Sequence, residues 1–500
     1  MEKKNIVPQV LNFFKNDRSI LIFAGIFSLL SISSIISFWK FGSYLSPDTV
    51  GYFQITIGFP DALSSLSPFY PFLLSNLPLS LLPIFDRVLV LNLLTGILAF
   101  YCLYKIALHA DKNAGIILLT FGISLLSWWS FRVLGSAHAD SIFYLLLLIW
   151  LYLFIWSDKD DTHYFPAIGM VSALMVWVKL NALFLIPLLL VWVLIERNWR
   201  WLIVLGCVLA SWALFQWTVP ENIVQFHLTE KMAGEQSILN HLVLFYENMA
   251  SWMQVTLGII ISDVLSQFVP KPIAFILGLG WAFFLLAYLI LNKNKGENKT
   301  YQLLLFGVMY TLCFLAFQQW SGYREVNFRT LFPYLVVISW ATWTTLIRLK
   351  QKKIMMLLAI FISGHTLAGH ALLWQRDDVA SLIMAKKFHQ TEVKKNIEAV
   401  LEDSHQEIRT DAPEKIMLSF VDLQVLPVQP EAIFIEGKNK TLNQQEKLLE
   451  REQALASLLS GKAVVVLFQT DEFWEQAAEN ADVSTYRDNK VLILSLSRLP

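Results

Sequence analysis

Asp48 is the first residue of the chain whose position could support catalysis. It stands in Ser46-Pro47-Asp48-Thr49, shortly after an apolar run that ends at Trp39. A carboxylate close to apolar surroundings is partly desolvated, which raises its pKa towards the working pH that a general base needs. The alternative is that Asp48 caps a helix lying along a membrane interface. The residues alone leave both interpretations open.

Basic residues stand at the ends of other apolar runs. Lys179 separates two such runs, and Arg324 and Arg329 precede another. Ionisable groups within or at the end of a membrane span are costly and usually functional. Lys179 could instead extend its amine to the interface, and the two arginines could pair with Glu325 or cap a helix. These three residues are therefore candidates for a functional site, with those alternatives open.

The composition explains why charged residues stand between apolar runs. Of 500 residues, 56% are hydrophobic and 16% are charged, and the mean hydropathy is +0.52. A soluble domain carries about 25% charged residues, so much of this chain must lie in apolar surroundings. The formal net charge is zero, which gives no indication of a nucleic-acid partner. The three cysteines lie inside apolar runs and show no disulfide or metal spacing.

About eleven apolar segments approach the length of about 20 residues that crosses a membrane. Because unpaired backbone groups are not tolerated in lipid, each segment is expected to be a helix. The segments are 19–39, 88–108, 114–131, 141–157, 163–178, 180–195, 201–219, 273–291, 301–319, 330–347 and 354–374. The first ends in Phe-Trp-Lys rather than at a small-residue cleavage site, which predicts an uncleaved helix. The expected fold class is a polytopic α-helical membrane protein.

The Lys and Arg residues between these segments predict the orientation. With the N-terminus inside, sixteen of them face the cytoplasm and eight face the other side, up to residue 375. Cytoplasmic loops normally carry this excess. The eight outer ones are Lys40, Arg87, Arg132, Lys179, Lys231, Lys271, Arg324 and Arg329. The protein is thus expected in a bacterial inner or plasma membrane, with its long polar loops and its C-terminus outside the cytoplasm.

Residues 376–500 have a different pattern. Strand-length apolar runs occur at 415–420, 432–435, 463–468 and 491–496, and charged, helix-forming stretches occur at 379–402, 442–460 and 471–480. This alternation predicts a small α/β domain. We therefore expect a transmembrane domain over 1–375 and an extracytoplasmic α/β domain over 376–500. A lid or scaffold over the outer loops is the simplest role for the second domain.

Four outer-loop motifs together resemble one group of membrane enzymes. They are Asp48 with Tyr52 and then Ser67-Pro68-Phe69-Tyr70-Pro71, the segment Arg132 to Asp140, Trp177-Val178-Lys179-Leu180-Asn181, and Tyr323 to Pro333. Their order and spacing over about residues 15–350 resemble the GT-C superfamily, in its branch of dolichyl-phosphate-mannose protein mannosyltransferases and aminoarabinose transferases. The chain departs from that pattern in two places. The first loop has a single acid at its motif, and His138-Ala139-Asp140 stands where a Glu is more usual.

The resemblance implies an inverting glycosyltransferase whose donor is a sugar on dolichyl or undecaprenyl phosphate. Asp48 would deprotonate the acceptor as it attacks the anomeric carbon. Asp140, with His138, would orient the acceptor or share a divalent cation with Asp48, and the departures leave that cation open. Because a lipid phosphate leaves, no nucleotide site is required.

The resemblance also implies the binding residues. Tyr52 would contact the substrate. The lipid phosphate would be bound first by Arg324 and Arg329, because a guanidinium matches the phosphate oxygens, and then by Lys179 and Arg132. The expected partners are this donor, an acceptor that is a lipid, glycan or protein, and the membrane lipids.

Two other functions are compatible with the sequence. A transporter or lipid flippase needs broken helices or paired charges at mid-membrane, often in two similar halves. No internal repeat is visible here, and nearly all charges stand at the ends of apolar segments. An O-antigen ligase or polymerase would also use polyprenyl-linked sugars, but would depend on outer-loop arginines rather than on a first-loop carboxylate. Neutralising Asp48 would separate the two enzymes.

Overall fold

The structure, a computed structural model, describes most of the apolar segments and the core of the C-terminal domain. The described residues are 18–41, 52, 69–76, 82, 84–110, 114–127, 135, 139–157, 161, 163–218, 238–260, 266, 268–291, 299–321, 328–375, 397, 407–411, 425–428, 432–435, 438–441, 444–467, 470–480, 482–488 and 491–496. The chain forms two compact units. One comprises Met1–Trp39 with Leu89–Gln375, and the other Lys40–Val88 with Arg376–Pro500. Residues 40–88, which include the first outer loop, are thus grouped with residues 376–500. The sequence had predicted a single domain boundary at residue 375.

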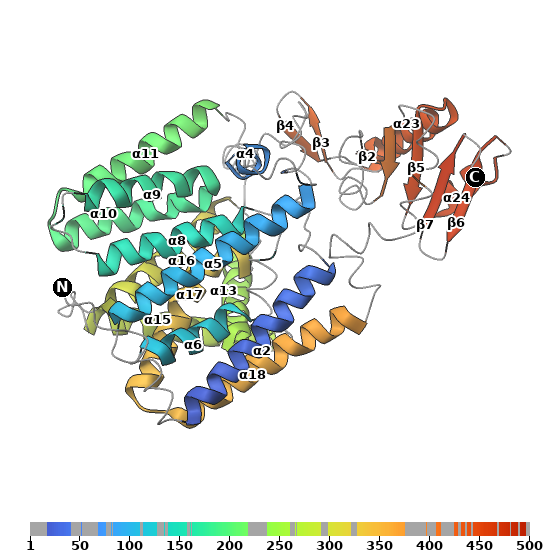
Figure 1. The fold of residues 1–500 in the computed structure, drawn as a ribbon. Helices are drawn as coiled ribbons and strands as arrows, with labels where there is room; N and C mark the ends of the chain where they lie inside the picture. Colours follow the sequence, from blue (N-terminus) through green and yellow to red (C-terminus); the bar gives the residue numbers. More distant parts are fainter. Residues whose placement is uncertain are drawn as a thin grey trace. The chain divides into compact units, whose positions relative to one another are not determined.

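The first unit is a bundle of α-helices (Figure 1). Its helices are α2 (Arg18–Phe41), α5 (Ile84–Ala110), α6 (Ala114–Leu125), α8 (Asp140–Trp156), α9 (Tyr164–Val178), the 3₁₀ helix η2 (Leu180–Phe184), α10 (Leu185–Glu196), α11 (Trp201–Thr218), α13 (Ile238–Ile260), α15 (Lys271–Leu291), α16 (Lys299–Ser321), α17 (Phe328–Arg348) and α18 (Lys352–Gln375). Helices α2 and α5 continue into the second unit at one end.

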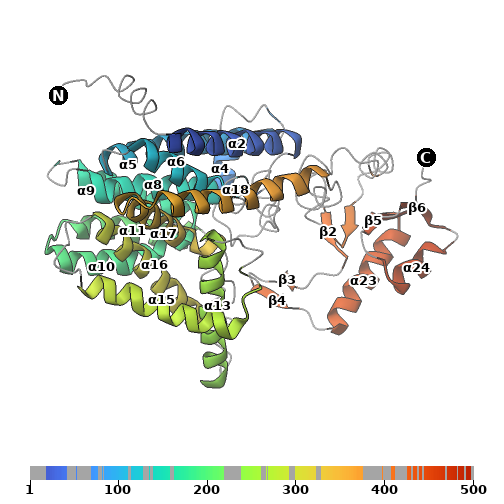
Figure 2. The same cartoon turned by 90° about the horizontal axis from the view of Figure 1, so that it is seen from below.

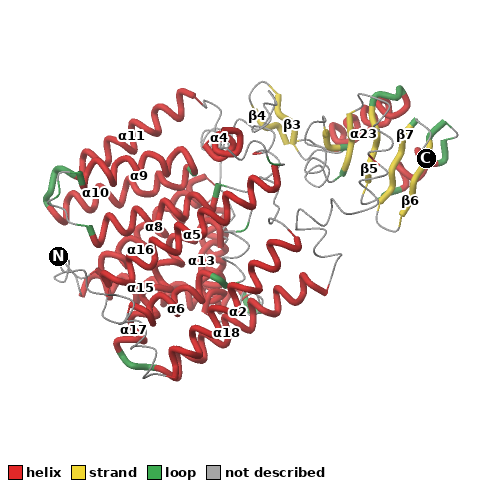
Figure 3. Tube along the Cα trace, viewed as in Figure 1, coloured by secondary structure: helices red, strands yellow, loops and turns green. Residues whose placement is uncertain are grey.

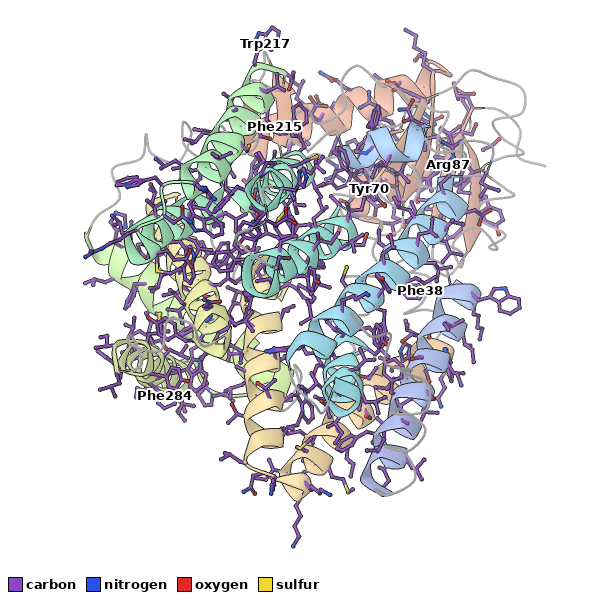
Figure 4. The ribbon with its side chains drawn as sticks, turned by 60° about the vertical axis from the view of Figure 1, so that its left-hand side comes forward. Phe38, Tyr70, Arg87, Phe215, Trp217 and Phe284 are labelled. Carbon is purple, nitrogen blue, oxygen red and sulfur yellow. The ribbon has the colours of Figure 1, made fainter. Side chains whose placement is uncertain are left out.

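The spans predicted from hydropathy are present as helices. Seven described helices are long and apolar enough to cross a membrane, and four shorter apolar helices cover 115–125, 140–155, 164–178 and 180–194. Together they match the eleven predicted segments one to one. The protein is therefore a multi-pass membrane protein of the predicted fold class. Large apolar side chains cover its outside, such as Phe284 and Trp217, which are 57% and 81% exposed (Figure 4).

Buried polar side chains join the spans to one another. The Trp150 indole N–H donates to Ser172 Oγ at 2.8 Å, which connects α8 to α9. In the same way Trp343 on α17 donates to Ser124 on α6 at 2.7 Å. Such bonds hold helices together where lipid offers no hydrophobic driving force.

The first and last spans lie side by side and run in the same direction (Figures 1 and 2). His370 Nδ1 and Ser37 Oγ are hydrogen-bonded at 2.7 Å, and the Trp374 indole N–H donates to the same hydroxyl at 3.0 Å. These contacts are close to the C-terminal ends of both α2 and α18. The two helices therefore end at the same face of the bundle.

Helix α13 is an element that hydropathy did not predict. Residues 220–272 lie between two predicted spans, and within them residues 238–260 form a 23-residue helix that runs at an angle to α2 and α18 (Figure 2). It crosses α15 at Gly278, where a Cβ atom would meet the Met249 carbonyl oxygen at 3.0 Å. Lys271 pairs with Glu247 at 3.8 Å beside this crossing. The sequence did not predict this helix, because mixed polar and apolar residues lower its mean hydropathy.

In the second unit, α4 (Phe69–Asn76) follows the first-loop motif. Arg87 donates to the Leu82 carbonyl at 2.7 Å and to the Leu74 carbonyl at 3.2 Å, so its guanidinium joins α4 to the start of α5 (Figure 4). The sequence from Pro68 to Pro83 contains four prolines. Because proline interrupts a helix, so many of them favour short helices over a long one.

The strands of the second unit form two sheets (Figure 3). The main sheet has the order β2-β1-β5-β7-β6, and β3 pairs with β4 antiparallel. The strands are β1 (Glu407–Thr410), β2 (Val425–Pro427), β3 (Ala432–Ile435), β4 (Lys438–Thr441), β5 (Ala463–Leu467), β6 (Ser484–Asp488) and β7 (Val491–Ser495), and the helices are α23 (Gln444–Leu459) and α24 (Glu472–Ala478).

The small α/β domain is present as the sequence predicts. Strands β3, β5 and β7 and helices α23 and α24 lie within one or two residues of their predicted positions. Leu458 and Trp474 from the helices pack on Val465 and Leu494 of the sheet. The short strands β1, β2, β4 and β6 were not predicted. The predicted strand 415–420 lies outside the described residues, as does the predicted helix 379–402 apart from residue 397.

Candidate functional site

Asp140 is the first residue of α8, and its side chain is only 1% exposed. A carboxylate is favoured in the first turn of a helix, where the backbone N–H groups carry partial positive charge. The next residue holds this helix end in place, because Ser141 Oγ donates to Asn92 Oδ1 on α5 at 2.9 Å. Asp140 is therefore held in position by the start of α8 and by the contact of the next residue with α5.

Lys179 reaches Asp140 because the backbone breaks at that lysine. Helix α9 ends at Val178, Lys179 is extended with φ −159° and ψ 125°, and η2 begins at the next residue. The Lys179 N–H still closes the last turn of α9 by bonding the Met175 carbonyl at 2.9 Å. The amine then pairs with Asp140 Oδ1 and lies 5.9 Å from the centre of the Phe143 ring.

Arg329 approaches the same carboxylate from α17. Its Nε donates to Asp140 Oδ2 at 2.7 Å. Pro333 lies four residues later inside α17, and a proline cannot donate to the carbonyl four residues before it. Tyr144 supplies that donor instead, since its hydroxyl bonds the Arg329 carbonyl at 3.0 Å. Tyr144 is one turn along α8 from Asp140, so α8 contacts Arg329 twice.

Asp140, Lys179 and Arg329 form what we term the Asp140 cluster. Within the cluster itself, one carboxylate contacts two cationic side chains. The carboxylate is fully buried, whereas the lysine and arginine side chains remain 18% and 33% exposed. A buried ion pair is maintained only when its geometry and hydrogen bonds are good. The cluster thus holds two cationic side chains in fixed positions at the ends of three elements.

A second set of contacts supports the cluster. The Tyr310 hydroxyl on α16 donates to the Thr330 carbonyl at 3.0 Å, and the Tyr310 side chain is also hydrogen-bonded to Asn181. The Phe184 ring packs edge-on to Tyr310, with 5.6 Å between ring centres. The start of α17 and the segment after Lys179 are therefore both tied to α16.

The structure brings together three of the predicted site residues. These are Asp140, Lys179 and Arg329, which the sequence had placed on one face of the membrane. The predicted residues Asp48, Arg132, His138 and Arg324 lie outside the described residues. Tyr52 belongs to the second unit, where it is 7% exposed and its ring lies 5.2 Å from that of Tyr70.

The divalent cation that the sequence left open does not fit Asp140 in this arrangement. Both carboxylate oxygens contact cationic side chains, so a metal ion there would stand beside two positive charges. Within the described parts of the chain, no three His, Cys, Asp or Glu side chains are grouped for metal binding. The acid instead orients the lysine and the arginine.

Sequence reasoning did not identify Tyr144 and Tyr310 as part of the site. The sequence does contain an indication of the role of Tyr144. Pro333 must leave the Arg329 carbonyl without its helical donor, so a buried hydroxyl from a neighbouring helix could be expected there. Nothing comparable marks Tyr310, whose role depends on how α16 packs against α17.

Comparisons with known proteins show similarity to solved structures. No protein-family model matches the chain, and no curated protein matches it. Among solved structures, the chain is similar to the crystal structure of ArnT from Cupriavidus metallidurans bound to undecaprenyl phosphate. The identity is 12% and the TM-score 0.44, with 96% of this chain and 98% of that chain covered.

Proposed function

We propose that the protein is an inverting glycosyltransferase that moves a sugar from a polyprenyl-phosphate donor to an acceptor on the extracytoplasmic face. The observation that carries this proposal is the Asp140 cluster. Its two cations are held by one buried carboxylate yet remain partly exposed. A phosphate group is the ligand that such a fixed guanidinium and ammonium pair suits.

The charge of the cluster favours a phosphodiester. A sugar joined to a polyprenyl phosphate carries one negative charge, which the two cationic side chains of Lys179 and Arg329 would attract. When the bond to the sugar breaks, the phosphate gains a second negative charge. Groups fixed beside a developing charge stabilise the transition state more than the ground state. The cluster would therefore promote departure of the lipid phosphate.

The complete reaction needs a base for the acceptor. In our proposal Asp48 takes the proton of the acceptor hydroxyl while its oxygen bonds the anomeric carbon. The bond from that carbon to the phosphate oxygen breaks, and its electron pair leaves with the polyprenyl phosphate. One displacement inverts the anomeric centre. Tyr52, Arg132, His138 and Arg324 are further candidates for contacts with the donor or the acceptor.

The experiment uses the purified protein in lipid nanodiscs with an undecaprenyl-phosphate-linked hexose. We expect an acceptor-dependent release of undecaprenyl phosphate, measured by mass spectrometry. Asp48→Asn should lower this release by about 10²–10⁴-fold, because an amide cannot accept the proton. Asp482→Asn is the control, since Asp482 is an exposed residue of the C-terminal domain.

Two results would contradict the proposal. If Asp48→Asn is as active as the wild type, Asp48 is a helix cap and not a base, since Asn caps as well as Asp. If the lipid crosses the bilayer with its sugar bond intact, the protein is a flippase. A flippase is expected to have its charges at mid-membrane, whereas the Asp140 cluster lies at the ends of α8, α9 and α17.

A further inference from the structure

Tyr310 contacts both segments that carry the cationic side chains of the candidate site. It is 3% exposed, and its hydroxyl donates to the Thr330 carbonyl at 3.0 Å. A hydroxyl has one proton to donate and can also accept hydrogen bonds. Because that proton is directed at Thr330, the bond with the Asn181 side chain is donated by the Asn181 amide. One hydroxyl thus connects the residue after Arg329 with the residue two positions after Lys179.

The bond to Asn181 bears on Lys179 because the backbone is not helical at that lysine. Lys179 is extended, and η2 begins directly after it. The Ala182 N–H donates to the Lys179 carbonyl at 3.0 Å, so the position of this turn determines the position of the lysine backbone. The Phe184 ring packs edge-on to Tyr310, with 5.6 Å between ring centres. The segment after Lys179 is therefore held on α16 by a hydrogen bond and a ring contact.

The bond to Thr330 depends on the close approach of α16 and α17. One turn before Tyr310, a Cβ atom at Gly307 would meet Val337 Cγ1 at 3.0 Å, so a side chain there would push the two helices apart. The first turn of α17 is then bonded from two sides. Helix α16 bonds it at the Thr330 carbonyl, and α8 bonds it at the Arg329 carbonyl.

Tyr310 differs from Tyr144 in the segments that it reaches. Tyr144 bonds the Arg329 carbonyl, whereas Tyr310 is bonded beside both cations. Two cations bind one phosphate group best when their separation matches its oxygens, and groups that are ordered before binding lose less entropy when the ligand arrives. Resting on the function proposed above, we propose that Tyr310 is a positioning residue that fixes Lys179 and Arg329 relative to each other for the phosphate of the donor.

The test measures the affinity of single and double variants in nanodiscs for undecaprenyl phosphate. Tyr310→Phe keeps the ring and removes the hydroxyl, so it should weaken binding by about three- to tenfold, as the loss of one hydrogen bond does. In an Arg329→Gln or a Lys179→Gln background the same change should weaken binding by less than about twofold, because the separation of two cations no longer matters when one is absent.

Two further variants show through which segment the tyrosine acts. Asn181→Ala removes the bond on the Lys179 side alone. It should weaken binding in the wild type and in Arg329→Gln to a similar extent, and should have little effect in Lys179→Gln. Tyr301→Phe, in the first turn of α16, is the matched control and should bind as the wild type does.

The outcomes separate this inference from the function on which it rests. If Tyr310→Phe binds as the wild type does, or weakens binding by the same factor in all three backgrounds, the tyrosine serves only the stability of the bundle and the inference is wrong. Binding of the lipid phosphate at the two cations would still stand in that case. If the wild type does not bind undecaprenyl phosphate, the proposed function fails.

Discussion

Pro333 determines which group bonds the Arg329 carbonyl. The helix cannot supply the donor, and the Tyr144 hydroxyl takes its place at 3.0 Å. Tyr144 stands on the same helix as Asp140, so one element orients both the backbone and the guanidinium of Arg329. Tyr144 is therefore a positioning residue, because it acts on the candidate phosphate site through Arg329.

A double substitution tests this role. Tyr144→Phe should lower stability by about 1 kcal/mol, as the loss of one hydrogen bond does, and should weaken binding of undecaprenyl phosphate. Adding Pro333→Ala restores a backbone N–H to the Arg329 carbonyl and should recover much of that binding. Thermal unfolding and lipid titration measure the two effects. If Pro333→Ala gives no recovery, the tyrosine acts through packing alone.

The sequence identified residues of the site, but it did not predict which of them contact one another. Acids and bases at the ends of apolar segments are visible in the sequence, which identified Asp140, Lys179 and Arg329. Their contact depends on the extended backbone of Lys179 and on the packing of α17 against α8, neither of which has a local sequence pattern. The sequence therefore ranked Arg324 equally with Arg329.

At the scale of elements, apolar segments were predictable because length and hydropathy decide them. Helix α13 was not, since its stability depends on burying one face against α15, α16 and α17. Residues Asn240, His241, Glu247 and Asn248 interrupt its apolar pattern. The strands of the C-terminal sheet were likewise predictable only where their residues are apolar. Buried β5 and β7 were predicted, and β6, whose residues STYRD are mostly polar, was not.

Gly278 tests how closely α13 must approach α15. A side chain there would meet the Met249 carbonyl at 3.0 Å, whereas a Cβ at Gly280 on the same helix has nothing within 4 Å. Gly278→Leu should therefore destabilise the protein by about 1–3 kcal/mol, as overpacking does. Gly280→Leu should be close to neutral. Equal melting temperatures for the two variants in detergent would show that the crossing is not tight.

For the whole molecule, the parallel course of α2 and α18 supports an odd number of spans. Both helices end at one face, where His370 and Trp374 bond Ser37. The apolar helices that match the predicted spans number eleven within the described residues, and we predict that the C-terminal domain lies outside the cytoplasm. The excess of Lys and Arg on the N-terminal side agrees with this orientation.

Reporter fusions test the orientation. A reporter after Pro500 should be extracytoplasmic, and reporters inserted at Lys295 and Lys352 should be cytoplasmic. Accessibility to a membrane-impermeant label gives the measurement. Because α2 and α18 run in the same direction, a cytoplasmic C-terminus would mean that the whole protein has the opposite orientation. The C-terminal domain would then lie away from the face on which we propose catalysis.

The affinity for undecaprenyl phosphate is the measurement that tests the central claim most directly. Arg329 and Arg348 stand near opposite ends of α17, so Arg329→Gln and Arg348→Gln remove the same charge at different faces of the bundle. Losing a charge-assisted hydrogen bond costs about 1.5–3 kcal/mol, so Arg329→Gln should weaken binding by about 10- to 150-fold. Arg348→Gln should bind as the wild type does. Equal affinities for the two variants, both folded, would contradict a phosphate site at the Asp140 cluster.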